Sequence, residues 1–346
     1  MQQEPLISVI TTFFNEEKLL GRCLDSVKNQ SYDNIEVVLV NDGSSDLSLE
    51  IANGYFSDFK LCKIISIQNS GHSEAKNVAL RNITGEYVTF LDADDEFEVG
   101  MISAFVERIN EQNSDLIICN ISALSEDGQK QYNSYWNNEI VLLRETKSLI
   151  AELYSHRISD SVWAKMFKTA LAQRISFEKG LWFDDRPYLL EYLHIAKTVS
   201  FIDDCLLRIY RRNESITRRT LETKRIVDCH RLFELELTIA KKYNTFDMLK
   251  ERIVKHQLDS LMDTFLIQII ERKTIIKLHE VEKTYLFYLN EFNKVIEKNN
   301  IRLKFKDKIA LTLLRLPAFL GWEITNALMN LLKNRRVQFL KEMKNI

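Results

Sequence analysis

The sequence is poor in the residues that mark fibrous, disordered or disulfide-rich proteins. Its 346 residues include only 3 Pro, 9 Gly and 5 Cys, which excludes a collagen-like or low-complexity chain. The cysteines are odd in number and show no C-x-x-C spacing, so a reducing compartment suits them better than a disulfide framework. The six histidines form no H-x-x-H or H-E-x-x-H pair, and zinc is therefore not indicated.

The chain also lacks targeting signals and a strong charge of either sign. Its first residues do not combine a basic start with a long apolar centre and a small-residue cleavage site, as a secretory signal would. No charge-free apolar run approaches the ~18 residues of a membrane span. Because 47 basic residues face 49 acidic ones, the overall charge favours no nucleic-acid partner. We expect a cytoplasmic protein.

What is present is the pattern of an α/β domain followed by helices. Apolar strands are predicted at about 6–13, 35–40, 61–67 and 86–91, with helices at 16–29, 47–59 and 73–81 between them. This alternation predicts a mostly parallel sheet flanked by helices. From about residue 220, helical periodicity replaces the strand signals. We expect two domains, 1–218 and 219–346.

The last 46 residues differ in charge from the rest. Residues 301–346 contain 10 Lys or Arg against 3 Asp or Glu, a net charge of +7. Basic amphipathic helices of this kind can lie on an anionic membrane surface, which would give peripheral contact with the cytoplasmic face of the inner membrane. An ordinary helical bundle with a solvated basic face, or an oligomerisation role, explains the same pattern.

Three carboxylates follow the predicted strand at 86–91. Asp92, Asp94 and Asp95 stand where open α/β sheets bind ligands, beyond the carboxyl end of a strand. Hard cations such as Mg²⁺ or Mn²⁺ take carboxylate oxygens together with phosphates and water. The cluster therefore predicts a divalent metal bound to a diphosphate. The structural alternative is an acidic turn that caps the following helix.

A fourth carboxylate, Asp42, follows the strand at 35–40 in the turn N-D-G-S-S-D. It could accept hydrogen bonds from a ribose hydroxyl or a base N–H, although Asp-Gly is also an ordinary turn. The segment after the first strand contains no G-x-G-x-x-G, and no G-x-x-x-x-G-K-S/T occurs. A Rossmann dehydrogenase and a P-loop enzyme are thereby disfavoured.

Four segments resemble the bacterial family 2 glycosyltransferases, which have the GT-A fold. They are I-S-V-I-T-T-F-F-N-E-E from Ile7, V-V-L-V-N-D-G-S-S-D from Val37, N-S-G-H-S-E-A-K-N-V-A-L from Asn69 and G-E-Y-V-T-F-L-D-A-D-D from Gly85. Their order and spacing also match the family. A weaker likeness continues to about residue 218, and the C-terminal third is not covered.

The resemblance implies roles for residues that bind the donor. Thr12 and Phe14 would border the nucleobase, Asp42 would contact the base or ribose, and Lys76 stands where the family usually has Arg. Lysine keeps the charge of arginine but loses its planar fork, so a general attraction to phosphate is the expectation.

The family's D-x-D element falls on Asp92 and Asp94, and the second carboxylate is implied as the direct metal ligand, with Asp95 as the fallback. Arg211 or Arg212 would neutralise the departing diphosphate.

The resemblance also implies a general base. W-F-D-D-R-P-Y from Trp182 is similar to the family's acidic element at the start of a helix, and Asp185 is the predicted base. A carboxylate at a helix N-terminus is stabilised in its charged form. The same residue could instead cap the helix, with Pro187 in its first turn.

The implied function is transfer of a sugar, with inversion, from a nucleotide-sugar donor to a glycan or lipid-linked glycan. We expect a UDP-linked donor and a capsule, lipooligosaccharide, lipopolysaccharide or teichoic acid as product. A non-catalytic nucleotide-sugar or glycan-binding scaffold is the main alternative. A sugar-nucleotide pyrophosphorylase is less compatible, because it should show a Gly-rich, Arg-containing loop after the first strand. The enzyme hypothesis requires Asp42, Asp92–Asp95 and Asp185 to converge.

Overall fold

The computed structural model describes residues 4–125, 131–132, 146–155, 157–211, 223–270, 275–303 and 307–308. The chain divides into two compact units. The first comprises Met1–Arg219 with Lys241–Tyr243, and the second comprises Thr220–Ala240 with Asn244–Ile346.

The first unit begins with a block of four parallel strands. Strand β1 (Ile7–Phe13) pairs with β2 (Ile35–Asn41) on one side and β4 (Tyr87–Phe90) on the other, and β2 pairs with β3 (Leu61–Ser66). β1, β2 and β4 are buried along almost their whole length, as expected of a sheet covered on both faces. The predicted α/β class with a mostly parallel sheet flanked by helices is confirmed.

The second half of the sheet is mixed. Strand β8 (Lys165–Lys168) lies antiparallel between β4 and β6 (Leu116–Ser125). β9 (Val199–Arg211) runs parallel to β6, and two short strands pair antiparallel at the periphery. They are β5 (Glu96–Phe97) against β9 and β7 (Gln131–Tyr132) against β6. The order of the main path is β3-β2-β1-β4-β8-β6-β9-β5.

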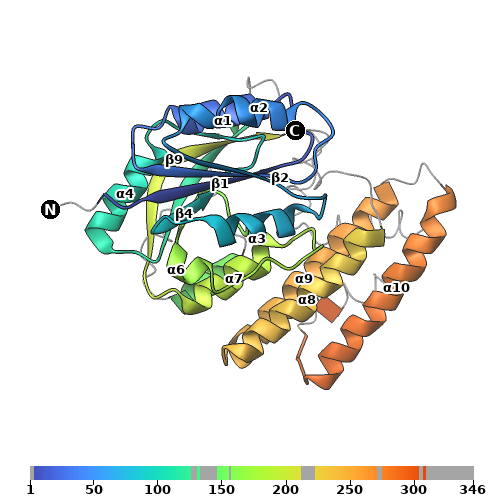
Figure 1. Cartoon of the computed structure of the whole chain (residues 1–346). Coiled ribbons are helices and arrows are strands. Elements are labelled where there is room, and N and C mark those ends of the chain that lie inside the picture. The colour runs from blue at the N-terminus through green and yellow to red at the C-terminus, as the bar shows by residue number, and fades with distance from the viewer. Residues whose placement is uncertain are drawn as a thin grey trace. The chain divides into compact units, whose positions relative to one another are not determined.

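Helices cover both faces of the sheet (Figure 1). One face carries α1 (Leu20–Lys28), α2 (Ser48–Gly54) and α4 (Met101–Gln112), whose apolar side chains share one core with the strands. The other carries α3 (His72–Asn82), α6 (Thr169–Ala172) and α7 (Asp185–Ile195). The remaining elements of the first unit are the short η1 (Phe56–Asp58) and α5 (Thr146–Tyr154).

An aromatic cluster packs α7 against the sheet. Phe177 stacks on Tyr188 with 4.0 Å between ring centroids, and Phe90 from β4 meets both rings edge-on. Phe167 from β8 lies edge-on to Tyr192. Such contacts add about 0.5–1.5 kcal/mol per pair beyond area burial, so they hold the start of α7 at a defined place relative to β4.

Helix α1 begins at Leu20, four residues later than the predicted start at residue 16. The backbone N–H groups of Asn15, Glu16 and Glu17 instead donate to side chains of the loop after β2 and of the first residue of α2, at 3.0, 2.8 and 3.0 Å. The acceptors are Ser44, Ser48 and Asp46. These bonds between two loops compete with helix formation and join the two loops at the carboxyl ends of β1 and β2.

The second unit is helical, as its periodicity predicts. Its described helices are α8 (Thr223–Lys242, except the last two residues), α9 (Phe246–Ile270) and α10 (Ile275–Lys298). Among the residues that the structure describes, no helix combines the length and apolar character needed to cross a bilayer. Most of the basic segment 301–346, on which the membrane-surface prediction depends, lies outside the described residues.

Candidate functional site

Strands β1, β2 and β4 deliver the predicted acidic residues to one edge of the sheet. The backbone N–H of Asp42 donates to the Phe13 carbonyl at 2.9 Å, where β1 and β2 end together. The N–H of Leu91 donates to the Ile10 carbonyl at 2.9 Å, so β4 ends beside the same strand. Asp92 therefore leaves the sheet at the same edge as Asp42.

The turn after β4 gathers Asp92, Asp94 and Asp95. One carboxylate oxygen from each lies within 4.8 Å of the others. Arg22 from α1 supports the turn by donating to the Asp94 carbonyl at 2.7 Å and pairing with Glu96 at 2.7 Å. One Asp95 oxygen accepts the Tyr210 N–H at 3.1 Å, so a backbone group of β9 holds the end of this cluster.

This donor set fits a hard divalent cation. Mg²⁺ binds carboxylate oxygens at about 2.0–2.1 Å, so two ligands on one ion lie at most about 4.2 Å apart, and small side-chain rotations would bring oxygens that lie within 4.8 Å of one another to that spacing. Burial and the neighbouring Asp94 raise the pKa of Asp92 to about 7, against the lowering effect of Lys76. Negative charge is thus costly at Asp92, and a bound cation would offset that cost.

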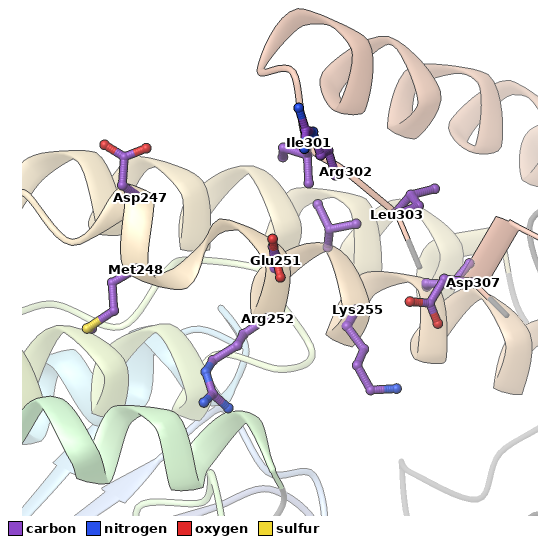
Figure 2. A pocket seen from close by; sticks show the side chains of 11 residues that line it. Asp247, Met248, Glu251, Arg252, Lys255, Ile301, Arg302, Leu303 and Asp307 are labelled. Carbon is purple, nitrogen blue, oxygen red and sulfur yellow. The ribbon is translucent and has the colours of Figure 1, made fainter. Parts of the chain in front are cut away.

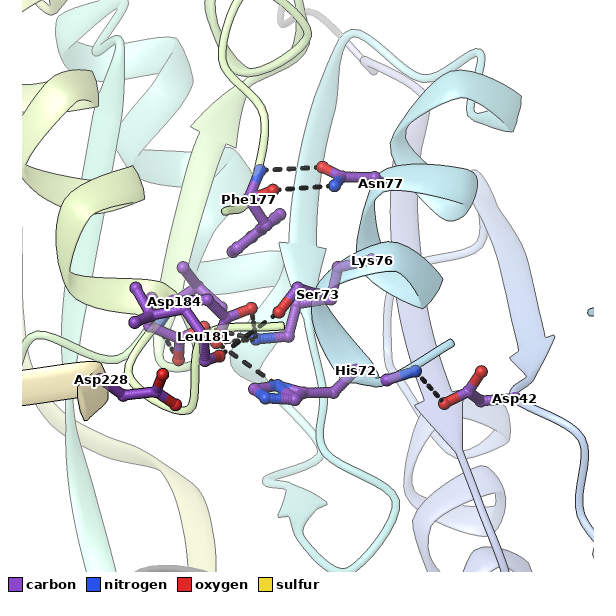
Figure 3. Close-up of polar contacts among 12 residues, drawn as sticks. Asp42, His72, Ser73, Lys76, Asn77, Phe177, Leu181, Asp184 and Asp228 are labelled. Carbon is purple, nitrogen blue, oxygen red and sulfur yellow. Dashed lines mark hydrogen bonds and ion pairs between the residues drawn. The ribbon is translucent and has the colours of Figure 1, made fainter. Parts of the chain in front are cut away.

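Lys76 in α3 links two halves of the site that are more than 100 residues apart in sequence. Its Nζ lies 2.5 Å from Asp185 Oδ1 and 3.3 Å from Asp184 Oδ2, and it is also 4.7 Å from the centre of the Phe177 ring. Figure 3 shows Lys76 and His72 reaching from α3 toward Asp184. His72 Nδ1 lies 3.3 Å from Asp184 Oδ1.

The pKa shifts of Lys76, Asp184 and His72 result from burial and from the charges of their neighbours. Burial alone would lower the pKa of Lys76, but the carboxylates of Asp184, Asp185 and Asp92 outweigh it, so the net shift is upward. Burial raises the pKa of Asp184 despite Lys76 and His72. Burial lowers the pKa of His72, with Asp184 opposing and Lys76 reinforcing the shift. Lys76 is therefore charged, and His72 is mostly neutral at pH 7.

Asp185 is the first residue of α7, and it does not cap that helix. No side chain makes a capping hydrogen bond at this N-terminus. Asp185 Oδ1 pairs with Lys76, and Oδ2 accepts the Val162 N–H at 3.1 Å. The geometry therefore does not favour the alternative in which Asp185 caps α7, because both of its carboxylate oxygens face other elements.

Two further contacts fix α3 against the segment that leads to α7 (Figure 3). Asn77 donates to the Phe177 carbonyl at 2.9 Å and accepts the Phe177 N–H at 2.8 Å. Ser73 Oγ donates to the Leu181 carbonyl at 3.4 Å. The position of Asp185 beside Lys76 therefore depends on backbone contacts that sequence spacing does not reveal.

Asp42 has a structural role that the sequence did not predict. Its Oδ1 accepts the Ser70 N–H at 2.7 Å and its Oδ2 the Gly71 N–H at 2.9 Å. Gly71 has a φ of +87°, a conformation that side chains with a Cβ rarely adopt. Asp42 thereby fixes the turn into α3, and each of its oxygens keeps a lone pair for a further donor.

The other predicted donor-binding residues lie near the ends of strands β1 and β9. Thr12 is half-buried in β1, and Phe14, directly after that strand, is 45% exposed. Arg211 is the last residue of β9, but its side chain and the whole of Arg212 lie outside the described residues.

The second unit contains a hollow of about 460 Å³ between α9 and residues 301–303 and 307 (Figure 2). Charged side chains of both signs line it, among them Glu251, Arg252 and Lys255. None of the predicted site residues belongs to it.

Lys76→Met tests whether this lysine holds the acidic pair together. Removing one partner of a buried ion pair costs about 3–5 kcal/mol, so we expect a loss of about 3 kcal/mol in unfolding free energy at pH 7. Because the pKa of Lys76 is raised, its stabilisation is fully present below about pH 10.5. The loss should be smaller at pH 5 than at pH 7, because the pKa of the Asp184 carboxyl is raised and the group takes up protons as the pH falls.

Urea unfolding at the two pH values measures this effect, and Lys76→Arg is the charge-preserving control. An equal loss at both pH values would show that packing, and not charge pairing, is the role of Lys76.

Residues 8–179 match the family described as "Glycosyl transferase family 2". Among curated proteins, the chain is 30% identical over 219 residues to the glycosyltransferase GlyA of Streptococcus pneumoniae, covering 61% of this chain and 31% of that protein. It is 28% identical over 247 residues to GlyG of the same organism, covering 65% and 80%. The chain thus spans about a third of the length of GlyA.

Solved structures share the fold. TarS 1-349 of S. aureus, in complex with UDP-GlcNAc, aligns with a TM-score of 0.59 at 18% identity, covering 85% of this chain and 92% of that chain. The mannosyltransferase PcManGT of Pyrobaculum calidifontis, in complex with GDP-Man and Mn²⁺, aligns with a TM-score of 0.52 at 15% identity, covering 89% and 86%.

Proposed function

We propose that this chain, whose residues 8–179 belong to glycosyl transferase family 2, transfers a sugar from a nucleotide-sugar donor to a bacterial surface glycan. The observation that carries this proposal is the meeting of Asp185 with Lys76 at the sheet edge where the Asp92–Asp95 cluster begins. Transfer of a sugar from a nucleotide-sugar donor requires groups of these three kinds: a carboxylate, an ammonium group and a cluster of oxygen ligands.

The donor is proposed to be UDP-linked. TarS was solved with UDP-GlcNAc, which supports a UDP-linked donor, and we propose that it binds at the carboxyl ends of β1 and β2. Thr12 and Phe14 would border the base, Asp42 would accept from the base or ribose, and Lys76 would attract the diphosphate. Arg211, at the end of β9, is a further candidate for neutralising the charge of the diphosphate.

Asp185 is the proposed general base. It would take the proton from the acceptor hydroxyl as the oxygen attacks the anomeric carbon and the nucleoside diphosphate leaves from the opposite face, so the configuration inverts. Lys76 and the Val162 N–H hold the two Asp185 oxygens in place, which orients the carboxylate.

Asp94 and Asp92, with Asp95 as the fallback, would hold Mn²⁺ or Mg²⁺. The metal supplies charge neutralisation for the departing diphosphate when it is bound. The PcManGT structure contains Mn²⁺ together with GDP-Man, which supports this assignment by analogy of fold.

The acceptor is proposed to be a glycan or lipid-linked glycan on the cytoplasmic face of the membrane. Other similar proteins include a teichoic acid poly(glycerol phosphate) polymerase from Staphylococcus epidermidis, 29% identical over 192 residues, of which the chain covers 26%. We further propose that residues 1–218 are the catalytic domain and that the helical part, 219–346, brings it to an anionic membrane surface through its basic C-terminal segment.

Acceptor-dependent release of nucleoside diphosphate tests the proposal. Purified protein is incubated with a panel of UDP- and GDP-sugars, Mn²⁺ and candidate glycan acceptors, and we expect release from one donor only when an acceptor is present. Melting temperatures with each donor identify the ligand independently, because a ligand that binds the native state stabilises it. Donor binding without release with any acceptor would instead support a scaffold. Formation of nucleoside triphosphate and sugar 1-phosphate from the donor when pyrophosphate is added would indicate a pyrophosphorylase.

A further inference from the structure

Lys165 in β8 is a fully buried cation that the proposed mechanism does not use. Lys165 is only 1% exposed. Its Nζ donates to the Ser161 carbonyl at 2.7 Å. The next N–H along the chain, that of Val162, donates to Asp185 Oδ2 at 3.1 Å. The Ser161 carbonyl and the Val162 N–H belong to one peptide group, so a single rigid plane joins Lys165 to Asp185.

We infer that Lys165 is a positioning residue for Asp185. It holds the Ser161–Val162 peptide in the orientation that presents its N–H to the carboxylate. In a trans peptide the carbonyl and the N–H point in opposite directions, so an ammonium group bound to the oxygen on one side fixes the donor on the other. A flip of this peptide would replace the donor with a carbonyl oxygen facing a carboxylate. The inference rests on the proposed role of Asp185 as base.

The backbone around this peptide is shaped to bring Lys165 back to it. Ala164 has a φ of +55°, which is uncommon for a residue with a side chain. This kink lets the chain turn back after Val162 and enter β8. The Ala164 carbonyl accepts the Cys119 N–H from β6 at 3.0 Å, so the kink is anchored to the neighbouring strand.

The charges around Lys165 agree with this role. Burial lowers the pKa of Lys165 to about 8, while Asp160, Cys119 and Asp185 oppose the shift. Asp160 pairs with Arg186 at 3.2 Å, so Lys165 is not needed as its partner. A lysine this deeply buried cannot reach a substrate, and its direct hydrogen bond is to the peptide that supports Asp185.

Lys165→Met tests the inference in the full-length protein. We expect kcat to fall about tenfold, the cost of one misplaced hydrogen bond to a charged group, while the KM for the donor is unchanged. The acid limb of the pH–rate profile should move to higher pH, because a carboxylate that has lost an N–H donor is protonated more easily. Lys168→Met is the matched control, since Lys168 lies in the same strand, is half-exposed and approaches Asp115 at 3.7 Å.

A second measurement does not depend on activity. In protein labelled with ¹⁵N-valine, the amide resonance of Val162 should shift in Lys165→Met but not in Lys168→Met. If the Met variant does not fold, Lys165→Gln takes its place. A wild-type pH–rate profile together with an unchanged Val162 resonance would overturn the inference. If the wild-type protein releases no nucleotide, the proposed function fails, and the Val162 resonance alone decides the role of Lys165.

Discussion

Asp185→Asn is expected to lower kcat by about 10²-fold or more, the usual cost of losing a general base, with donor affinity retained. The substitution keeps the size of the side chain but removes its capacity to take a proton. It also leaves one hydrogen-bond donor without its acceptor, because one Asp185 oxygen accepts from Lys76 and the other accepts from the Val162 N–H. An asparagine can offer its single oxygen to only one of these donors.

The measurement compares kcat with the dissociation constant for the donor, obtained without acceptor. Glu191→Gln on the same helix is the control, because it changes a carboxylate outside the proposed site. If donor affinity fell as much as kcat, Asp185 would be a structural or donor-binding residue, and the base would have to be sought elsewhere.

The strand ends were predictable from sequence because they depend on local pattern. Buried β-branched runs predict β1, β2 and β4, and parallel strands place their carboxyl ends at one edge, so Asp42 and Asp92 were expected at the same edge of the sheet. The location of Asp185 was expected only from the family resemblance. Its contact with Lys76 spans 109 residues and depends on how α3 and α7 pack, which no local pattern encodes.

The features that were missed are backbone contacts. Nothing in the turn N-D-G-S-S-D indicates that both Asp42 oxygens accept N–H groups from Ser70 and Gly71, since the conformation of one loop decides the partners of another. The four-residue strand β8 is too short for its alternation to be recognised. Its antiparallel insertion between β4 and β6 nevertheless places the Ser161–Val162 peptide beside Asp185.

Asp94→Ala is expected to abolish metal-dependent turnover, with a loss of about 10²-fold or more in kcat/KM if the metal contributes several kcal/mol of charge stabilisation. The variant leaves Asp92 and Asp95 as ligands, and one Asp95 oxygen already accepts the Tyr210 N–H. The upward shift in melting temperature that Mn²⁺ gives the wild-type protein should be lost as well.

The same substitution should not weaken the metal-free protein, and this separates the metal role from a folding role. Asp94 raises the pKa of Asp92, which means that the two carboxylates repel each other, so removing one relieves the repulsion. We therefore expect the metal-free melting temperature of Asp94→Ala to equal or exceed that of the wild type. Asp33→Ala, at a side chain 92% exposed, is the control for losing one negative charge. Near-native turnover of Asp94→Ala with added Mn²⁺ would contradict the metal role, because the two carboxylates that remain would then be sufficient.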